Sequence, residues 1–239
     1  MKGSKVTAIV LAAGQGKRMN STIAKQFLML KDKPVLYYSL KAFEKSSVDE
    51  IILVTGTGQT DDCKKDIIDF YQINKVTHII EGGKERYNSV YNALICAESS
   101  DYVLIHDGAR PFITAEAINH IMTQVKEYKA CILGTPVKDT IKTVDSDGFI
   151  VSTPDRRTLW SAQTPQAFLY DEIREAYERF YKEENNNDYA ITDDAMVYET
   201  FMKQPVKMIM GDYQNIKITV PEDLGYAKQY LEQALLENA

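Results

Sequence analysis

The sequence predicts a three-layer α/β fold with a mostly parallel sheet and a protruding β-hairpin arm. Short apolar runs alternate with amphipathic helical patterns through the first 137 residues, which is typical of βαβ units. The alternation then stops, and two short β-rich runs follow, joined by an Asp-Gly turn. With 239 residues, 44% of them hydrophobic, the chain can bury a full core. We expect one domain over residues 1–239, with residues 138–157 as the arm.

The elements of the first half follow from the period of their apolar residues. The expected strands are Val6–Leu11, Ile51–Val54, Thr77–Glu81, Tyr102–His106 and Ala130–Val137. The expected helices between them are Pro34–Lys45, Asp61–Tyr71, Arg86–Ala97 and Thr114–Tyr128. Pro34 suits the first turn of its helix, because a residue at that position needs no N–H partner.

The second half begins with the hairpin, in which Thr140–Val144 and Phe149–Thr153 flank the turn Asp145–Gly148. Because an isolated hairpin is marginal in water, it should rest on its own body or on another subunit. The segments expected after it are a helix over Asp171–Tyr181, a helix capped by Thr192, a strand over Val206–Met210 and a helix from Pro221. No internal repeat or linker is evident.

Composition excludes several classes of protein. The net charge of −6 predicts no binding to nucleic acid or to an anionic membrane. The three cysteines lie far apart without CxxC spacing, which argues against a disulfide framework or a zinc site and favours a reducing cytosol. The apolar run Val6–Ala13 leads into a basic glycine loop instead of a cleavage site, so it is not read as a secretion signal. We expect a cytoplasmic protein.

The strongest local signal is the loop after the first strand, Leu11–Met19, followed by Lys25 and Gln26. Ligands of open α/β sheets bind beyond the carboxyl ends of the strands, and small residues let backbone N–H groups approach a phosphate. The loop lacks the third glycine of a dinucleotide fingerprint, where Met19 stands, and the GKS or GKT of a P-loop. That argues against a nicotinamide oxidoreductase. A plain glycine turn with solvated Lys and Arg stays an alternative.

Two further strand ends carry polar side chains. Asp107 and Arg110 follow the fourth strand, where a carboxylate can hold Mg²⁺ or a ribose hydroxyl and an arginine can hold phosphate. For His106 we favour a structural hydrogen bond over a general base. Gly82–Ser89 joins the third strand to a helix, whose first amides and serine hydroxyl suit a phosphate or a base edge, or merely cap the helix. Three such ends on one sheet edge predict a nucleotide site.

The residues resemble the family of 2-C-methyl-D-erythritol 4-phosphate cytidylyltransferases of the non-mevalonate isoprenoid pathway. The motifs are LAAGxGxRM with KQ (Leu11–Met19, Lys25, Gln26), GGxxRxxSV (Gly82–Val90), HDxARPF (His106–Phe112), DTIK (Asp139–Lys142), TxDRxxLWxxQTPQAF (Thr153–Phe168), ITDDA (Ile191–Ala195) and NIKIT-PEDL (Asn215–Leu224). The related ribitol 5-phosphate cytidylyltransferases tend to LAGG and HDAVRPF, so Ala12-Ala13-Gly14 and Ala109-Arg110 favour the erythritol enzymes. The chain departs from the pattern at Gly108, Asn88 and Arg157.

The resemblance implies a Rossmann-like nucleotidyltransferase that joins CMP from CTP to 2-C-methyl-D-erythritol 4-phosphate and releases pyrophosphate. The catalytic residues it implies are Lys25, Lys217 and Arg18. Those implied for CTP are Ala12, Ala13, Gly14, Gly16, Gly83, Ser89 and Asp107. Those implied for the acceptor are Asp107, Arg110, Thr140, Arg156, Thr164 and Lys217. The alternatives are a ribitol 5-phosphate cytidylyltransferase and a non-catalytic nucleotide-binding regulatory protein.

The resemblance also implies Mg²⁺ as cofactor, with Asp107 as a possible ligand and the CTP phosphates as the other holder. It implies a homodimer in which the arm of one subunit brings Thr140 and Arg156 into the site of the other. Arg156 is preferred to Arg157 because it directly follows Asp155 in the motif. Asp193 and Asp194 are expected to cap and charge the N-terminus of a helix.

Overall fold

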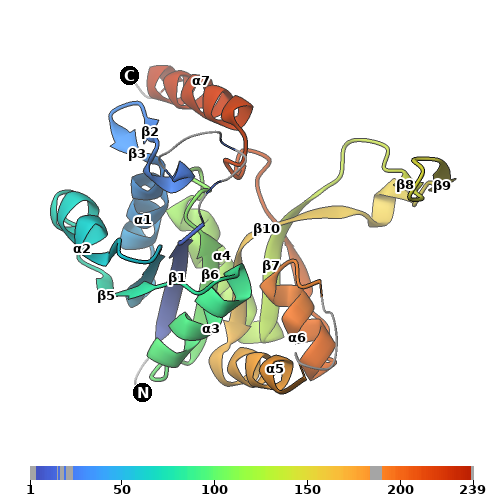
Figure 1. The fold of residues 1–239 in the computed structure, drawn as a ribbon, viewed down its shortest axis with the longest axis horizontal. Helices are drawn as coiled ribbons and strands as arrows, with labels where there is room; N and C mark the ends of the chain where they lie inside the picture. The colour runs from blue at the N-terminus through green and yellow to red at the C-terminus, as the bar shows by residue number, and fades with distance from the viewer. Residues whose placement is uncertain (1–3, 15, 17–18, 20–23, 184–189, 238–239) are drawn as a thin grey trace.

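The computed structural model describes residues 4–14, 16, 19, 24–183 and 190–237 (Figure 1). A seven-stranded sheet runs through the middle in the order β11-β7-β10-β6-β1-β4-β5. Its strands are β1 (Val6–Ala12), β4 (Glu50–Thr55), β5 (Val76–Glu81), β6 (Tyr102–Asp107), β7 (Ala130–Pro136), β10 (Trp160–Leu169) and β11 (Lys207–Met210). Only β10 pairs antiparallel with its neighbours in this sheet, so the expectation of a mostly parallel sheet is confirmed.

Helices cover both faces of the sheet and complete three layers. They are α1 (Val35–Lys45), α2 (Thr60–Cys63), α3 (Arg86–Cys96), α4 (Ala115–Tyr128), α5 (Tyr170–Glu183) and α6 (Asp194–Met202). The last helix, α7 (Pro221–Glu237), packs away from these two faces. One core cluster joins α1 and α4 to the sheet, and a second joins α3, α5 and α6 to the other face. Because both faces are covered, β1 and β4 are apolar at most positions, with no alternation of apolar and polar residues.

Short elements fill the connections. They are a 3₁₀ turn (Lys25–Phe27), the strand pair β2 (Met29–Leu30) and β3 (Lys33–Pro34), a π-helical stretch (Lys64–Asp69) and a second 3₁₀ turn (Arg156–Thr158). Helix α7 lies over β2 and packs on Leu30 and Val35 in a third small cluster. No described helix has the length and apolar character needed to cross a membrane.

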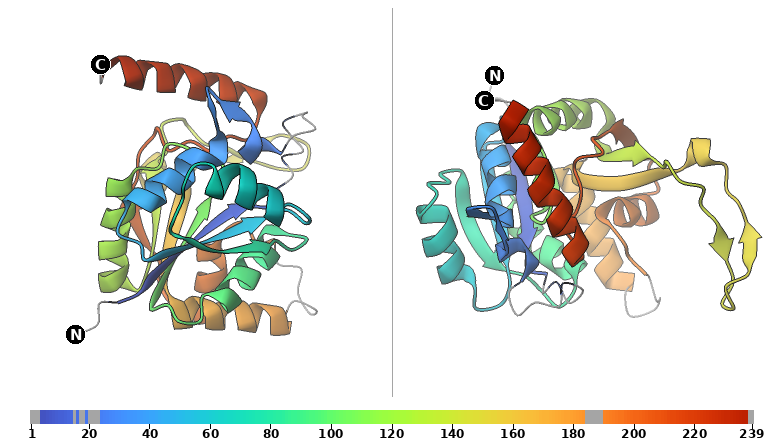
Figure 2. Two further views of the ribbon diagram at one scale, coloured as in Figure 1. Left: turned by 90° about the vertical axis from the view of Figure 1, so that its left-hand side faces the viewer. Right: turned by 90° about the horizontal axis from the view of Figure 1, so that it is seen from above.

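The arm projects from the body as a two-stranded ribbon of β8 (Thr143–Val144) and β9 (Ile150–Ser152), as Figure 2 shows. The side chain of Asp145 accepts the N–H groups of Asp147 and Phe149, at 3.0 and 2.9 Å, and Gly148 supplies the positive φ of 85°. Phe149 and Val151 are 73% and 68% exposed. The predicted hairpin is therefore confirmed, and its apolar side chains face solvent in the single chain.

The five strands and four helices expected before the arm are present, with small shifts of their ends. The helix expected over Asp61–Tyr71 is divided into α2 and the π-helical stretch, and Pro34 takes the N-cap position of α1 instead of its first turn. The prediction of Thr192 as a cap was wrong. Asp193 caps α6 by accepting the N–H of Met196 at 2.9 Å, because its carboxylate is the side chain at the N-cap position.

Candidate active site

The loops that follow β1, β5 and β6 meet at the carboxyl edge of the sheet, as the sequence predicted. The N–H of Gly108 donates to the carbonyl of Leu11 at 2.9 Å, which joins the loop after β6 to the end of β1. A Cβ at Gly82 would lie 2.5 Å from Cβ of Ala13 and 2.6 Å from Oγ of Ser89. Only glycine lets the β5 loop approach β1 this closely.

The first loop brings Lys25 back toward the end of β1. Gly16 has a φ of +63°, and a Cβ there would lie 3.2 Å from Cβ of Lys25. The side-chain amide of Gln26 is buried and donates to the carbonyl of Ala12. This hydrogen bond of Gln26 ties the 3₁₀ turn, which contains Lys25, to the end of β1. Arg18 lies outside the described residues.

Ser89, one of the residues implied for CTP, forms hydrogen bonds within its own loop. Its hydroxyl accepts the N–H of Gly83 at 3.1 Å and donates to the carbonyl of Glu85 at 3.2 Å. Asn88 completes a capping box with Glu85 at the start of α3. Ser89 is only 3% exposed, so it shapes the turn, and its contact with a nucleotide base stays a prediction.

Asp107 is the electrostatic centre of the site. One carboxylate oxygen lies 2.6 Å from Nζ of Lys217, and the other lies 3.3 Å from Nε of Arg86. Burial alone would raise the pKa of Asp107, but Arg86 and Lys217 outweigh it and hold the pKa far below its usual range. The carboxylate thus stays ionised and holds the ammonium group of Lys217 beside the loop that follows β6.

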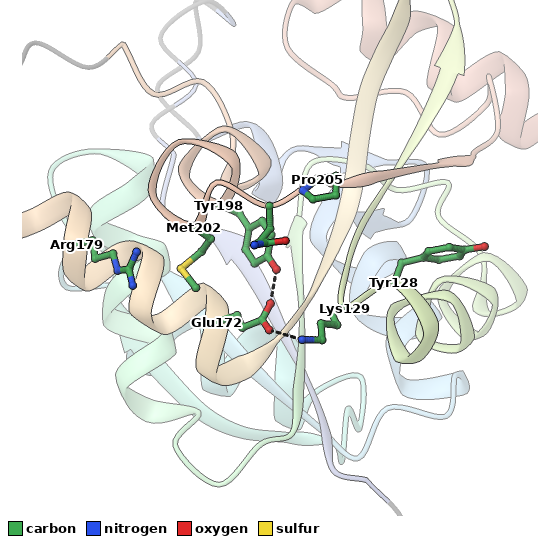
Figure 3. Close-up of a pocket in the computed structure, with 8 residues that line it drawn as sticks. Tyr128, Lys129, Glu172, Arg179, Tyr198, Met202 and Pro205 are labelled. Carbon is green, nitrogen blue, oxygen red and sulfur yellow. Dashed lines mark hydrogen bonds and ion pairs between the residues drawn. The ribbon is translucent and has the colours of Figure 1, made fainter.

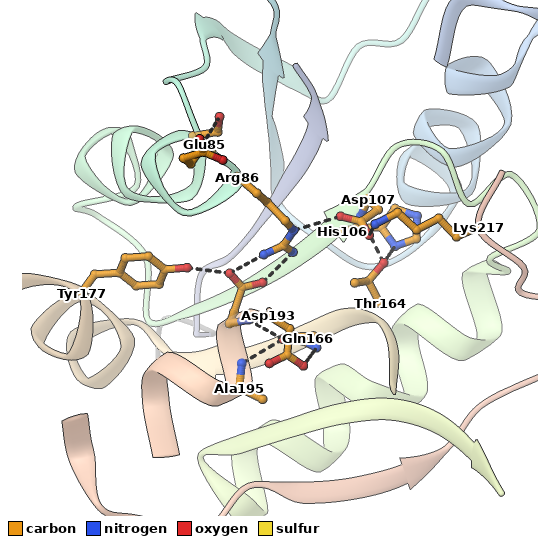
Figure 4. Close-up of polar contacts among 12 residues, drawn as sticks. Glu85, Arg86, His106, Asp107, Thr164, Gln166, Tyr177, Asp193, Ala195 and Lys217 are labelled. Atoms are coloured by element: carbon orange, nitrogen blue, oxygen red, sulfur yellow. Dashed lines mark hydrogen bonds and ion pairs between the residues drawn. The ribbon is translucent and has the colours of Figure 1, made fainter. Parts of the chain in front are cut away.

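Sequence reasoning missed Arg86 and Asp194, which Figure 4 draws together. Nη1 and Nη2 of Arg86 bind the two oxygens of Asp194 at 2.9 and 2.8 Å, and the hydroxyl of Tyr177 donates to the same carboxylate at 2.6 Å. Burial opposes the charge of Arg86, yet Asp194 and Asp107 raise its pKa well above the ordinary value. Asp194 lies in the first turn of α6, as expected, and it is fully buried because Arg86 compensates its charge.

Thr164 and Arg110 line the same end of the sheet. The Thr164 hydroxyl accepts the N–H of Asp107 at 3.1 Å and lies 3.1 Å from Nδ1 of His106. Nη1 of Arg110 donates to the carbonyl of Asn215 at 2.7 Å, two residues before Lys217. Burial lowers the pKa of His106 to about 3, so the ring is neutral and the structural interpretation of this residue is supported.

Thr140 and Arg156 belong to residues 138–157, the segment that forms the projecting arm (Figure 2). Nη1 of Arg156 donates to the carbonyl of Lys138 at 2.9 Å, across the root of the arm. Arg157 instead pairs with Asp155 at 2.7 Å. Arg156 thus lies near the root of the arm, whereas the charge of Arg157 is paired with Asp155.

A cavity of about 310 Å³ lies elsewhere, between α5, α6 and the end of α4 (Figure 3). Lys129 and Glu172 form an ion pair of 2.9 Å at its wall, and the hydroxyl of Tyr198 donates to the same carboxylate. Lys129 directly precedes β7, so the cavity adjoins the amino end of that strand. Ligands of such sheets bind at the opposite, carboxyl edge, and none of the predicted site residues lines this cavity.

The described residues contain no cluster of three or more His, Cys, Asp or Glu side chains that could hold a metal ion. Asp107 already has an ion pair at each oxygen. Both oxygens thus face a cation, and the role of Asp107 as a ligand of Mg²⁺ stays a prediction.

Comparison with known proteins identifies the family. The family model of 2-C-methyl-D-erythritol 4-phosphate cytidylyltransferase matches residues 6–233. The chain is 53% identical to the protein of that name from Lachnoclostridium phytofermentans, over 96% of this chain and 97% of the relative, and 51% identical to that from Lachnospira eligens, over 95% and 99%. The crystal structure of 4-diphosphocytidyl-2C-methyl-D-erythritol synthase from Anaerococcus prevotii is similar at a TM-score of 0.83 and 32% identity, covering 96% of both chains. The fold is similar to that solved structure, and the chain belongs to the 2-C-methyl-D-erythritol 4-phosphate cytidylyltransferase family, whose members are nucleotidyltransferases.

Proposed function

We propose that the chain transfers CMP from CTP to 2-C-methyl-D-erythritol 4-phosphate and releases pyrophosphate and 4-diphosphocytidyl-2-C-methyl-D-erythritol. The observation that carries the proposal is the 2.6 Å ion pair between Lys217 and Asp107 beside three glycine-bearing loops. The names of the most similar relatives support methylerythritol phosphate as the acceptor.

The reaction joins two anions, so its main barrier is repulsion between them. A phosphate oxygen of the acceptor attacks the α-phosphorus of CTP, a new P–O bond forms, and the bond to the bridging oxygen breaks with its electrons leaving on pyrophosphate. Lys25 and Lys217 neutralise the α-phosphate, and Arg18 holds the departing phosphates. One unit charge at 4 Å contributes about 4 kcal/mol at an effective dielectric constant of 20. Positioned cations therefore suffice, without a covalent intermediate.

Mg²⁺ is part of the proposal and would neutralise the outer phosphates of CTP when bound. The ion pairs at both oxygens of Asp107 favour the CTP phosphates as the ligands of Mg²⁺. Lys217 stays on Asp107 in this arrangement and approaches the α-phosphate as a fixed cation.

The active form we propose is a cytoplasmic homodimer with shared sites. The exposed apolar side chains of the arm support it, because they gain from burial on a second copy. Thr140 and Arg156 of that arm would bind the acceptor phosphate in the partner's site. Asp107, Arg110, Thr164 and Lys217 would complete that pocket. Ala12, Ala13, Gly14, Gly16, Gly83 and Ser89 would enclose the nucleotide.

An assay of CTP-dependent pyrophosphate release tests the proposal. We expect turnover with 2-C-methyl-D-erythritol 4-phosphate and much less with ribitol 5-phosphate. A clear preference for ribitol 5-phosphate would overturn the acceptor. Release with neither acceptor would favour a regulatory nucleotide-binding protein.

A further inference from the structure

We propose that Asp194 and Arg86 are positioning residues for Lys217: Asp194 fixes the guanidinium of Arg86, Arg86 fixes the carboxylate of Asp107, and Asp107 directs the ammonium group of Lys217 at the nucleotide. The inference rests on the proposed function, in which Lys217 acts on the α-phosphate. In the proposed mechanism, neither Asp194 nor Arg86 contacts substrate.

We call the four residues Asp194, Arg86, Asp107 and Lys217 the relay. Its first member is a carboxylate with no access to water. Asp194 is 0% exposed, and its two oxygens receive the parallel Nη1 and Nη2 bonds of Arg86 and the hydroxyl of Tyr177. A two-bond fork fixes both the distance and the plane of the guanidinium. The geometry therefore holds Arg86 in one orientation.

The backbone that carries Asp194 is itself held. Oε1 of Gln166, on β10, accepts the N–H groups of Asp194 and Ala195 at 3.1 and 3.0 Å. Nε2 of the same glutamine donates to Asp193 at 2.9 Å. The N-terminus of α6 is thus tied to the central sheet, and Asp194 serves as a fixed reference point for the site.

The third donor of Arg86 continues the relay. Its Nε lies 3.3 Å from Oδ1 of Asp107, while Oδ2 of Asp107 lies 2.6 Å from Nζ of Lys217. Charges alternate along the four groups and sum to zero. Lys217 is 36% exposed on a flexible stem, so the Asp107 contact restrains an ammonium group that would otherwise sample many positions.

Stability alone explains this arrangement poorly. Replacing a buried ion pair by apolar residues of similar volume is often neutral or stabilising, so the pair is weak evidence for a structural need. A lysine at position 86 would keep the charge, but it could not make the two parallel bonds to Asp194 and the contact with Asp107 at the same time. The fixed directions of the Arg86 N–H groups suit a residue that orients Asp107.

A double-mutant cycle tests the relay. Asp194→Asn should lower the single-turnover rate roughly 10-fold in the wild-type chain, and less than about 2-fold further in a Lys217→Ala chain, because coupled residues are not additive. We expect KM for CTP to change less than about 3-fold, since the lost interaction acts in the transition state. Arg86→Lys should behave like Asp194→Asn.

The matched control is Glu172→Gln. Glu172 also receives a tyrosine hydroxyl and a cation, from Tyr198 and Lys129, but at the opposite edge of the sheet. This variant should keep the wild-type rate even where its melting temperature falls.

The outcomes separate the two proposals. If Lys217→Ala keeps the wild-type rate, the proposed role of Lys217 fails and the relay fails with it. If Lys217→Ala is impaired but Asp194→Asn costs the same factor in both backgrounds, the relay alone is refuted. Should Asp194→Asn not fold, Arg86→Lys enters the same cycle, and a wild-type rate for that variant refutes the relay.

Discussion

Asp107→Asn should lower both the stability of the fold and the rate of the reaction. The substitution keeps the shape of the side chain and removes the charge that faces Arg86 and Lys217. A hydrogen bond to a charged group contributes about 1.5–3 kcal/mol, and the amide can replace only part of one of the two. Because Lys217 is 36% exposed, we discount its share for solvent screening. The expected loss is about 2 kcal/mol of unfolding free energy.

For a chain of this length, that loss corresponds to a fall in Tm of roughly 4–8 °C. Thermal unfolding at pH 7 measures it, and Asp155→Asn, on the exposed arm, is the control that should leave Tm unchanged. The folded-state pKa of Asp107 is depressed, so its contribution is present above the ordinary pKa of about 4 and is lost as pH falls further. The difference between wild type and variant should therefore narrow below about pH 4. Equal Tm values at pH 7 would refute the reasoning.

Three further predictions concern the loops and the arm. Lys25→Ala should reduce kcat by roughly 10²–10³ with an unchanged circular dichroism spectrum, and a near-normal kcat would remove this residue from the mechanism. Gly82→Ala should cost about 1–3 kcal/mol in urea unfolding, because the added Cβ meets Ala13 and Ser89, whereas Gly225→Ala, with open space around it, should not destabilise; equal effects would contradict the close approach. Arg156→Ala should raise KM for the acceptor more than KM for CTP, and mixing it with inactive Lys25→Ala chains should restore activity if sites are shared. No recovery in the mixture would exclude sharing.

The sequence predicted the parallel core because strands buried on both faces are short apolar runs, and the helices between them have apolar residues at helical spacing. It did not predict β10, which contains Ser161, Gln163 and Gln166 and so lacks an apolar pattern. Gln163 and Gln166 are nevertheless buried, because their amides bind the carbonyl of Asp212 and the N-terminus of α6. Only the tertiary structure reveals those partners.

The sequence predicted part of the site and missed another part. Strand ends and glycine loops located Asp107, Arg110 and the loops around them, since the carboxyl ends of parallel strands share one edge. The pair Arg86 and Asp194 was missed, because the two residues are 108 positions apart and each looks like an ordinary helix-start charge. A residue's partner across such a separation has no local signature.

The position of Lys217 along the chain also bears on how the protein is made. The central strands β1, β4 and β6 are complete by residue 107, whereas β11 and the lysine after it belong to the final part of the chain. Because a domain folds as a unit, the carboxyl edge of the sheet is complete only after the segment that carries Lys217 has been made. On the proposed mechanism, a chain released before residue 217 is therefore inactive.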